Sequence, residues 1–197
     1  MLFLTGPSEN STGWASLNPA LIEGHFEFAL ALIENEASMT TATKDGILLR
    51  NGVDCATQTK DGWAPLSLAT VGGHTEVVNL LLDNGADWAT RAIDGWTPLN
   101  LASTASDTNV VKLLLDKGAE FTTQNDKGHT PLASASDAGH VEVVRLLLAK
   151  GAHLTTLETI DNRGFTPLNL ASARGHTGIV RMLLERGAKH RKKEKDD

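Results

Sequence analysis

An interval of 33 residues recurs along this chain and constrains its fold more than any other feature. Glycine and proline mark the interval, which lengthens to 36 residues in the last copy: Gly62, Gly95, Gly128 and Gly164; Pro65, Pro98, Pro131 and Pro167. The copies are alike, as in DGWTPLNLASTASDTNVVKLLLDKGAE from Asp94 and RGFTPLNLASARGHTGIVRMLLERGAK from Arg163. A period of this length is typical of proteins that stack one structural unit several times.

Each copy predicts two short helices joined by a turn. A threonine precedes proline at Thr97, Thr130 and Thr166, and a hydroxyl residue followed by proline is the pairing expected at a helix start. Leu and Ala at i and i+3 give this first helix a thin apolar face, whereas Val-Val and Leu-Leu pairs give the second helix a broad one. A glycine beyond the second helix, first at Gly85, predicts where that helix ends.

The two-helix copies also predict how the chain forms a core. A helix pair this short cannot bury its own apolar stripe, so the copies must stack on one another. The shared pattern G-x-T-P-L-x-x-A, G-H-x-x-V-V-x-L-L-L and G-A, over residues 59–189, resembles the ankyrin repeat. That resemblance implies an all-α ankyrin-repeat solenoid, with hairpin loops projecting from one edge and the first helices lining a concave face. It also implies that the usual activity is to hold another protein, and we expect a non-enzymatic protein–protein interaction scaffold.

The regular pattern divides the chain into four parts. We expect a mobile leader over 1–12, degenerate and truncated repeats over 13–58, four regular repeats over 59–189 and a charged tail over 190–197. In the second part, a whole first helix and its turn are missing from the period. The gap is either a notch that a ligand or peptide occupies or a deletion that a modular fold tolerates. The last helix lacks an obviously polar outer face, so either the tail caps it or the chain belongs to a longer array.

Two departures from the family pattern bear on the packing. The family commonly has His after T-P-L, where this chain has Ser67, Asn100, Ala133 and Asn169. Asn can hydrogen-bond to a neighbouring repeat and Ala cannot, so the repeat that contains Ala133 is predicted to be looser. In the second regular copy Ser106-Asp107 replaces Gly-His, which predicts Asp107 or Thr108 as the cap of the next helix.

Partner-binding residues are predicted at positions that the period leaves exposed. The position after the turn glycine carries a column of mostly aromatic side chains, which either bind a partner or pack between hairpins. Charged residues flank the column at the hairpin tips and on the first helices. They form either a surface that contacts a specific protein or a polar face that is simply solvated. The predicted set is Trp63, Trp96, His129 and Phe165 in the column, Asp61, Asp94, Lys127 and Arg163 at the tips, and Asp137 and Arg174 on the first helices.

Charge and composition narrow the class of partner. The chain has 18 Lys and Arg against 24 Asp and Glu, and residues 1–188 alone have a formal charge of −8, which would repel nucleic acid. No stretch of about 20 apolar residues or export signal occurs, so neither a membrane nor secretion is expected. The lone Cys55 fits a reducing compartment. We expect a cytoplasmic protein. The basic run in the tail is either a nuclear localisation signal or a charged segment that solvates the C-terminal end of the stack.

The sequence contains no recognisable catalytic or metal-binding motif. Four of the seven histidines follow a turn glycine in separate copies and therefore do not converge on one metal ion: His25, His74, His140 and His176. We expect no catalytic residue, no metal and no cofactor, and the sequence leaves the oligomeric state open. The alternatives are a small-molecule or enzymatic site in the notch, built from Glu36, Lys44, Asp45 and Trp63, or a regulatory fragment of a larger multidomain protein.

Overall fold

The computed structural model describes residues 58, 62–152 and 156–188, which form α-helices, one 3-10 helix and loops. The chain divides into two compact units, Met1–Asp87 and Trp88–Asp197, and each is described by itself. Several parts of the sequence with predicted roles lie outside the described residues: the leader, the degenerate and truncated repeats with their notch, Cys55, Asp61 and the charged tail.

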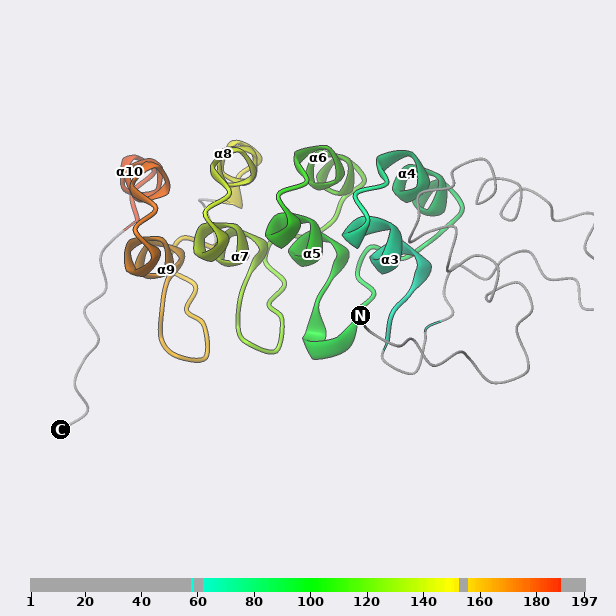
Figure 1. Cartoon of the computed structure of the whole chain (residues 1–197), viewed down its shortest axis with the longest axis horizontal. Helices are drawn as coiled ribbons and strands as arrows, with labels where there is room; N and C mark the ends of the chain where they lie inside the picture. The colour runs from blue at the N-terminus through cyan, green and yellow to red at the C-terminus, as the bar shows by residue number, and fades with distance from the viewer. Residues whose placement is uncertain (1–57, 59–61, 153–155, 189–197) are drawn as a thin grey trace, which may run out of the picture. The chain divides into compact units, whose positions relative to one another are not determined.

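The described part of the first unit is one helix pair, α3 (Pro65–Val71) and α4 (Thr75–Asp83), shown in Figure 1. Leu66 on α3 and Val77 and Leu81 on α4 are at most 1 % exposed. The residue before the proline is Ala64, which has no side-chain cap. This start therefore relies on Pro65 at the first turn, where a missing amide costs no hydrogen bond.

The second unit contains three helix pairs arranged in two rows (Figure 1). The inner row is α5 (Pro98–Ala105), α7 (Pro131–Ala138) and α9 (Pro167–Arg174). The outer row is α6 (Thr108–Asp116), α8 (Val141–Ala149) and α10 (Thr177–Glu185). Each helix contacts its counterpart in the next pair, as well as its own partner. The predicted stack of helix-turn-helix units is confirmed for these three repeats.

The capping predictions are confirmed in the second unit. The side-chain oxygens of Thr97, Thr130 and Thr166 accept hydrogen bonds from backbone amides three residues later, over 3.2–3.3 Å. At the start of α6, Asp107 Oδ1 accepts from the amide of Val110 at 3.0 Å, which selects Asp107 over Thr108 as the cap. Such caps satisfy amides that a helix start otherwise leaves without a partner.

The core of the second unit is continuous from one repeat to the next. Its largest side chains come from both rows and are at most 1 % exposed: Leu99, Leu114, Leu132, Leu147, Leu168, Ile179 and Leu183. Burial of one such side chain contributes about 1.5–3 kcal/mol to the free energy of folding. Because the rows contact from pair to pair, each repeat depends on its neighbour for that burial.

Polar bonds join the same repeats. The side-chain amide of Asn100 donates to the carbonyl of His129 at 3.0 Å, as predicted for an asparagine after T-P-L. The ring Nε2 of His140 donates to the carbonyl of Thr104 at 2.8 Å, and that of His176 to the carbonyl of Asp137 at 3.1 Å. These two turn histidines therefore bond each repeat to the one before it.

Replacement of Asn100 by Ala should destabilise the second unit. The variant leaves the carbonyl of His129 with one donor fewer and removes the acceptor of the Thr97 hydroxyl, within a buried site. We expect the free energy of unfolding to fall by about 1–3 kcal/mol, measured by urea unfolding. The control is Asn109→Ala, at an exposed position of α6, with an expected change within about 0.5 kcal/mol. Equal losses for the two variants would contradict the bridging role.

Candidate functional site

The hairpins of the second unit fix the residue that follows each turn glycine. In each hairpin, the residue three positions before the glycine donates its amide to the carbonyl of the residue just after it. The three bonds are Ala92 to Trp96 at 2.8 Å, Asn125 to His129 at 3.0 Å and Asp161 to Phe165 at 2.9 Å. These pairings place Trp96, His129 and Phe165 at equivalent positions at the base of successive hairpins.

Neighbouring hairpins are bonded to one another. The amide of Asp126 donates to the carbonyl of Asp94 at 2.9 Å, and the amide of Asn162 donates to the carbonyl of Lys127 at 3.1 Å. The approach is close enough to require glycine at Gly95, where φ is +71° and a Cβ would lie 2.2 Å from Asp126 Oδ1. The hairpins therefore form one connected layer beside the inner helices.

Asp161 organises the last hairpin. Its Oδ1 accepts from the amides of Arg163 and Phe165, both at 2.9 Å. Its Oδ2 accepts from Nε and Nη2 of Arg163 at 3.0 and 2.8 Å and from His129 Nε2 at 3.2 Å. The carboxylate is 1 % exposed. Five donors around one buried group hold Arg163 and Phe165 in a defined orientation.

These donors also determine the ionisation of Asp161. Burial by itself raises the pKa of the carboxyl group, because it removes the charged form from water. The hydrogen bonds from Phe165, Arg163 and His129 favour the charged form and together outweigh burial, so the pKa of Asp161 lies below its usual value. The carboxylate is therefore ionised at neutral pH.

A groove of about 280 Å³ lies between this hairpin and the ends of α7 and α9. The Arg163 guanidinium carbon is 5.2 Å from the centre of the Phe165 ring, within the range of a cation–π contact. Across the groove, Arg174 Nε donates to Asp137 Oδ1 at 3.0 Å, and this pairing raises the pKa of Arg174. The residues that line the groove are Asp137, Arg163, Phe165, Leu170, Ala173 and Arg174.

Four of the predicted partner-binding residues thus meet in one groove: Asp137, Arg163, Phe165 and Arg174. Asp94 and Lys127 are exposed at the tips of the two preceding hairpins, and Trp96 is half-buried. His129 is 8 % exposed, so it has a packing role through Asp161, and its place in a contact surface stays a prediction. Trp63 belongs to the first unit and is half-buried there.

A family model described as ankyrin repeats in three copies matches residues 44–125 and residues 121–194. The two matches together span well over half of the chain. The chain belongs to the ankyrin repeat family. Ankyrin repeats are generally protein–protein interaction modules, and the typical ankyrin protein is a non-enzymatic binding scaffold.

Three further findings accompany the family assignment. A search of curated protein sequences finds no match to this ankyrin repeat chain. Among the helices that the structure describes, none has both the length and the apolar character needed to cross a bilayer. Within residues 62–152 and 156–188, no three His, Cys, Asp or Glu side chains are grouped so that they could hold a metal ion.

The ankyrin pattern alone did not single out Asp161 and its equivalent Asn125. Both lie three residues before a turn glycine, and Asn125 Oδ1 accepts from the amides of Lys127 and His129, each at 3.0 Å. Asp and Asn commonly accept amides two residues later in tight turns. The sequence signal for these residues is an Asp or Asn three positions before the turn glycine, which indicates a side chain that organises the hairpin.

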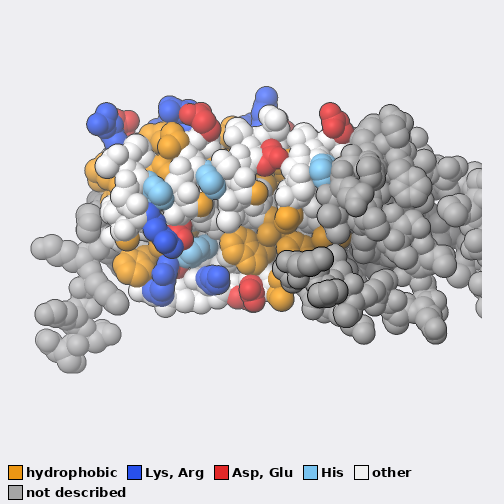
Figure 2. Space-filling model, in the orientation of Figure 1, with side chains coloured by type: hydrophobic (Ala, Val, Ile, Leu, Met, Phe, Trp, Pro, Cys, Tyr) orange, Lys and Arg blue, Asp and Glu red, His pale blue; other side chains and the backbone are white. Residues whose placement is uncertain are grey.

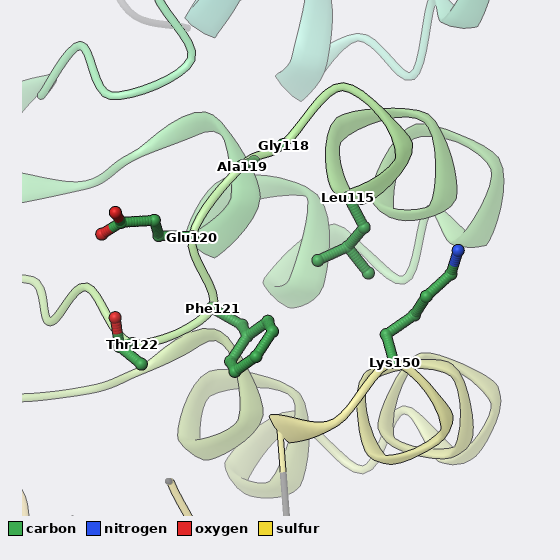
Figure 3. A pocket seen from close by; sticks show the side chains of 7 residues that line it. All are labelled: Leu115, Gly118, Ala119, Glu120, Phe121, Thr122 and Lys150. Atoms are coloured by element: carbon green, nitrogen blue, oxygen red, sulfur yellow. The ribbon is translucent and has the colours of Figure 1, made fainter. Parts of the chain in front are cut away.

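A second cavity, of about 460 Å³, lies against the loop that follows α6, with Lys150 at the end of α8 along its edge (Figure 3). In Figure 3, the Phe121 ring points into the cavity and the Lys150 side chain extends along its edge. The Lys150 ammonium is already paired with Asp116 Oδ1 at 2.6 Å. None of the predicted partner-binding residues lines this cavity, so the groove at Phe165 is the stronger candidate site.

The ionised Asp161 makes the stability of the second unit depend on pH. A carboxylate with a depressed pKa in the folded state stabilises the fold above its unfolded pKa of about 4 and loses that contribution as pH falls through the folded value. We expect the difference in free energy of unfolding between the wild type and Asp161→Asn to shrink from about pH 5 to pH 3. Urea unfolding at stepped pH measures it, and a difference that is constant with pH would contradict the proposed ionisation.

Proposed function

We propose that this ankyrin repeat chain is a non-enzymatic scaffold that holds another protein on the hairpin face of its second unit. The hairpin face consists of the three hairpins at 91–97, 124–130 and 160–166 and the solvent-exposed sides of α5, α7 and α9. The observation that carries the proposal is the groove at Phe165, which brings an aromatic ring, two guanidinium groups and a carboxylate to one place.

The rigidity of the face supports this function. Arg163 and Phe165 are held by Asp161, and successive hairpins are hydrogen-bonded to each other. A surface that is already ordered loses little conformational entropy when a partner docks. The hairpin face therefore has the property that an effective docking surface requires.

The residue types on the face support the same function. Tryptophan and arginine are enriched among the residues that contribute most of the binding energy at protein interfaces, and aromatic rings supply large contact area. Trp96 and Phe165 are half-buried, so part of each ring remains available to a partner. The negative charge of residues 1–188 argues for a protein partner over a nucleic acid.

The site proposed for the N-terminal notch has no comparable support. Trp63 is half-buried in the first unit, whereas Glu36, Lys44 and Asp45 lie outside the described residues. We therefore propose no second function. For the scaffold itself, we propose a location in the cytoplasm, with or without entry into the nucleus.

Removal of the two rings should abolish partner capture. We expect Trp96→Ala/Phe165→Ala to retain about a tenth or less of the partner that the wild-type chain captures from native extract, because such residues each cost about 2 kcal/mol or more when truncated. The control is Val141→Ala/Leu184→Ala, which removes two exposed apolar side chains from the outer helices and should capture normally.

A second variant separates binding from folding. Ala173 is exposed on α9 and lines the groove, so Ala173→Trp should fill the groove without loss of a packed side chain. Circular dichroism and thermal unfolding verify that each variant is folded. If the folded ring variant and Ala173→Trp both capture the partner as well as the wild type does, the hairpin face is not the binding site.

A further inference from the structure

The residue that caps the end of each outer helix is basic in the three repeats of the second unit. Positive charge is favourable at the C-terminal end of a helix, and these caps are Lys117, Lys150 and Arg186. In the first unit, the C-cap of α4 is Asn84, and Gly85 follows it. In Figure 2, basic side chains lie over α6, α8 and α10, and an acidic one lies over α4. Asn84 thus departs from its equivalents in charge and in chemistry.

An asparagine before a glycine can react with its own backbone. The amide nitrogen of Gly85 attacks Cγ of Asn84 and closes a succinimide ring, the Cγ–Nδ2 bond breaks, and ammonia leaves with the proton of the Gly85 amide. Water then opens the ring: hydrolysis at Cγ leaves aspartate, and hydrolysis at the backbone carbonyl carbon leaves isoaspartate. Glycine favours ring closure because it has no Cβ that would hinder the approach. Lysine and arginine at the equivalent positions cannot undergo this reaction.

The structure leaves Asn84 and Gly85 open to this reaction. Both residues are exposed, and a Cβ built on Gly85 would have no neighbouring atom within 4 Å, so ring closure displaces nothing. The Gly85 amide donates to the carbonyl of Leu82 at 3.2 Å, and Asn84 Nδ2 donates to that of Leu80 at 2.9 Å. Both bonds belong to the last turn of α4, and helix ends open at low cost in free energy. Opening of that turn frees both reacting groups.

Gly95, in the second unit, has the opposite environment. Asp94 precedes it, and an aspartate before a glycine forms the same succinimide with loss of water. Gly95 is buried, its amide donates to the carbonyl of Ala92 at 3.1 Å, and a Cβ there would clash with Asp126 Oδ1 on the next hairpin. Ring closure at Asp94 therefore requires the hairpin layer to separate.

We propose that Asn84 is a modification site at which the folded chain deamidates without an enzyme. The product loses the donor to Leu80 and places a carboxylate at the negative end of the α4 dipole, next in sequence to Asp83. Isoaspartate also lengthens the backbone at the point where the chain leaves the helix. The end of α4 is therefore weakened, while the reaction involves no residue of the hairpin face and is independent of the proposed scaffold function.

The test is incubation of the full chain in mildly alkaline native buffer, followed at timed intervals by tryptic peptide mapping with mass spectrometry. We expect Asn84 to convert to aspartate and isoaspartate well before Asn109 and Asn162, which are also exposed but precede valine and arginine. The rate should rise with pH, because the attacking amide must lose its proton. Trypsin separates this site from Asn51, which also precedes a glycine but lies outside the described residues.

Two controls separate reaction at the folded site from reaction of the unfolded chain. Asn84→Lys installs the residue type of the equivalent caps and should yield no isoaspartate at this position. In urea, isoaspartate should also appear at Asp94, because unfolding removes the hairpin layer. In native buffer, isoaspartate should appear at Asn84 and not at Asp94.

The outcomes decide the site and its consequence separately. Conversion of Asn84 in urea alone would show that the folded helix end protects it and would overturn the proposal, as would conversion in native buffer no faster than that of Asn109 and Asn162. Asn84→Asp carries the charge of the product and should unfold at a lower temperature than the wild type. Equal unfolding temperatures would contradict the weakening of α4. Partner capture is a different readout, so each of these results leaves the scaffold function to its own test.

Discussion

The fold of the second unit depends on one constraint, which is that helices of eight and nine residues cannot bury their own apolar stripe. Leu99 and Leu132 are buried because the next inner helix packs against the first, and Leu114 and Leu147 because the outer row does the same. The apolar core is therefore shared between repeats. That division leaves the hairpins and the exposed sides of the inner helices free to vary without loss of the core.

Hydrogen bonds between repeats and within the hairpins fix the shape of the surface that this stack presents. Asn100, His140 and His176 each donate across a repeat boundary to a backbone carbonyl. The Asn100 bond is buried, where an unpaired polar group would be costly. At the last hairpin, Asp161 accepts hydrogen bonds from the amides of Arg163 and Phe165 and from the Arg163 guanidinium. The groove at Phe165 is a consequence of that buried carboxylate as much as of the residues that line it.

The sequence predicts the regular part of this structure well, because residues that recur at a fixed interval occupy equivalent packing positions in successive repeats. The threonine caps follow from local chemistry repeated at a fixed interval, whereas the cap at Asp107 and the bridge from Asn100 follow from the local chemistry of residues that depart from the family pattern. The burial of His129 and the meeting of Arg163 with Arg174 do not follow from the interval. They depend on the path of the last hairpin, which Asp161 sets and which lies in the loop lengthened by three residues.

A scaffold of this kind binds its partner protein on the hairpin face and not on the outer helices. The most direct measurement is site-specific photo-crosslinking in native extract, with p-benzoylphenylalanine placed at Ala173 or at Arg181, both exposed. We expect a discrete crosslinked protein from position 173 and none from position 181. A crosslink from position 181 alone, or equal crosslinking from both, would contradict it.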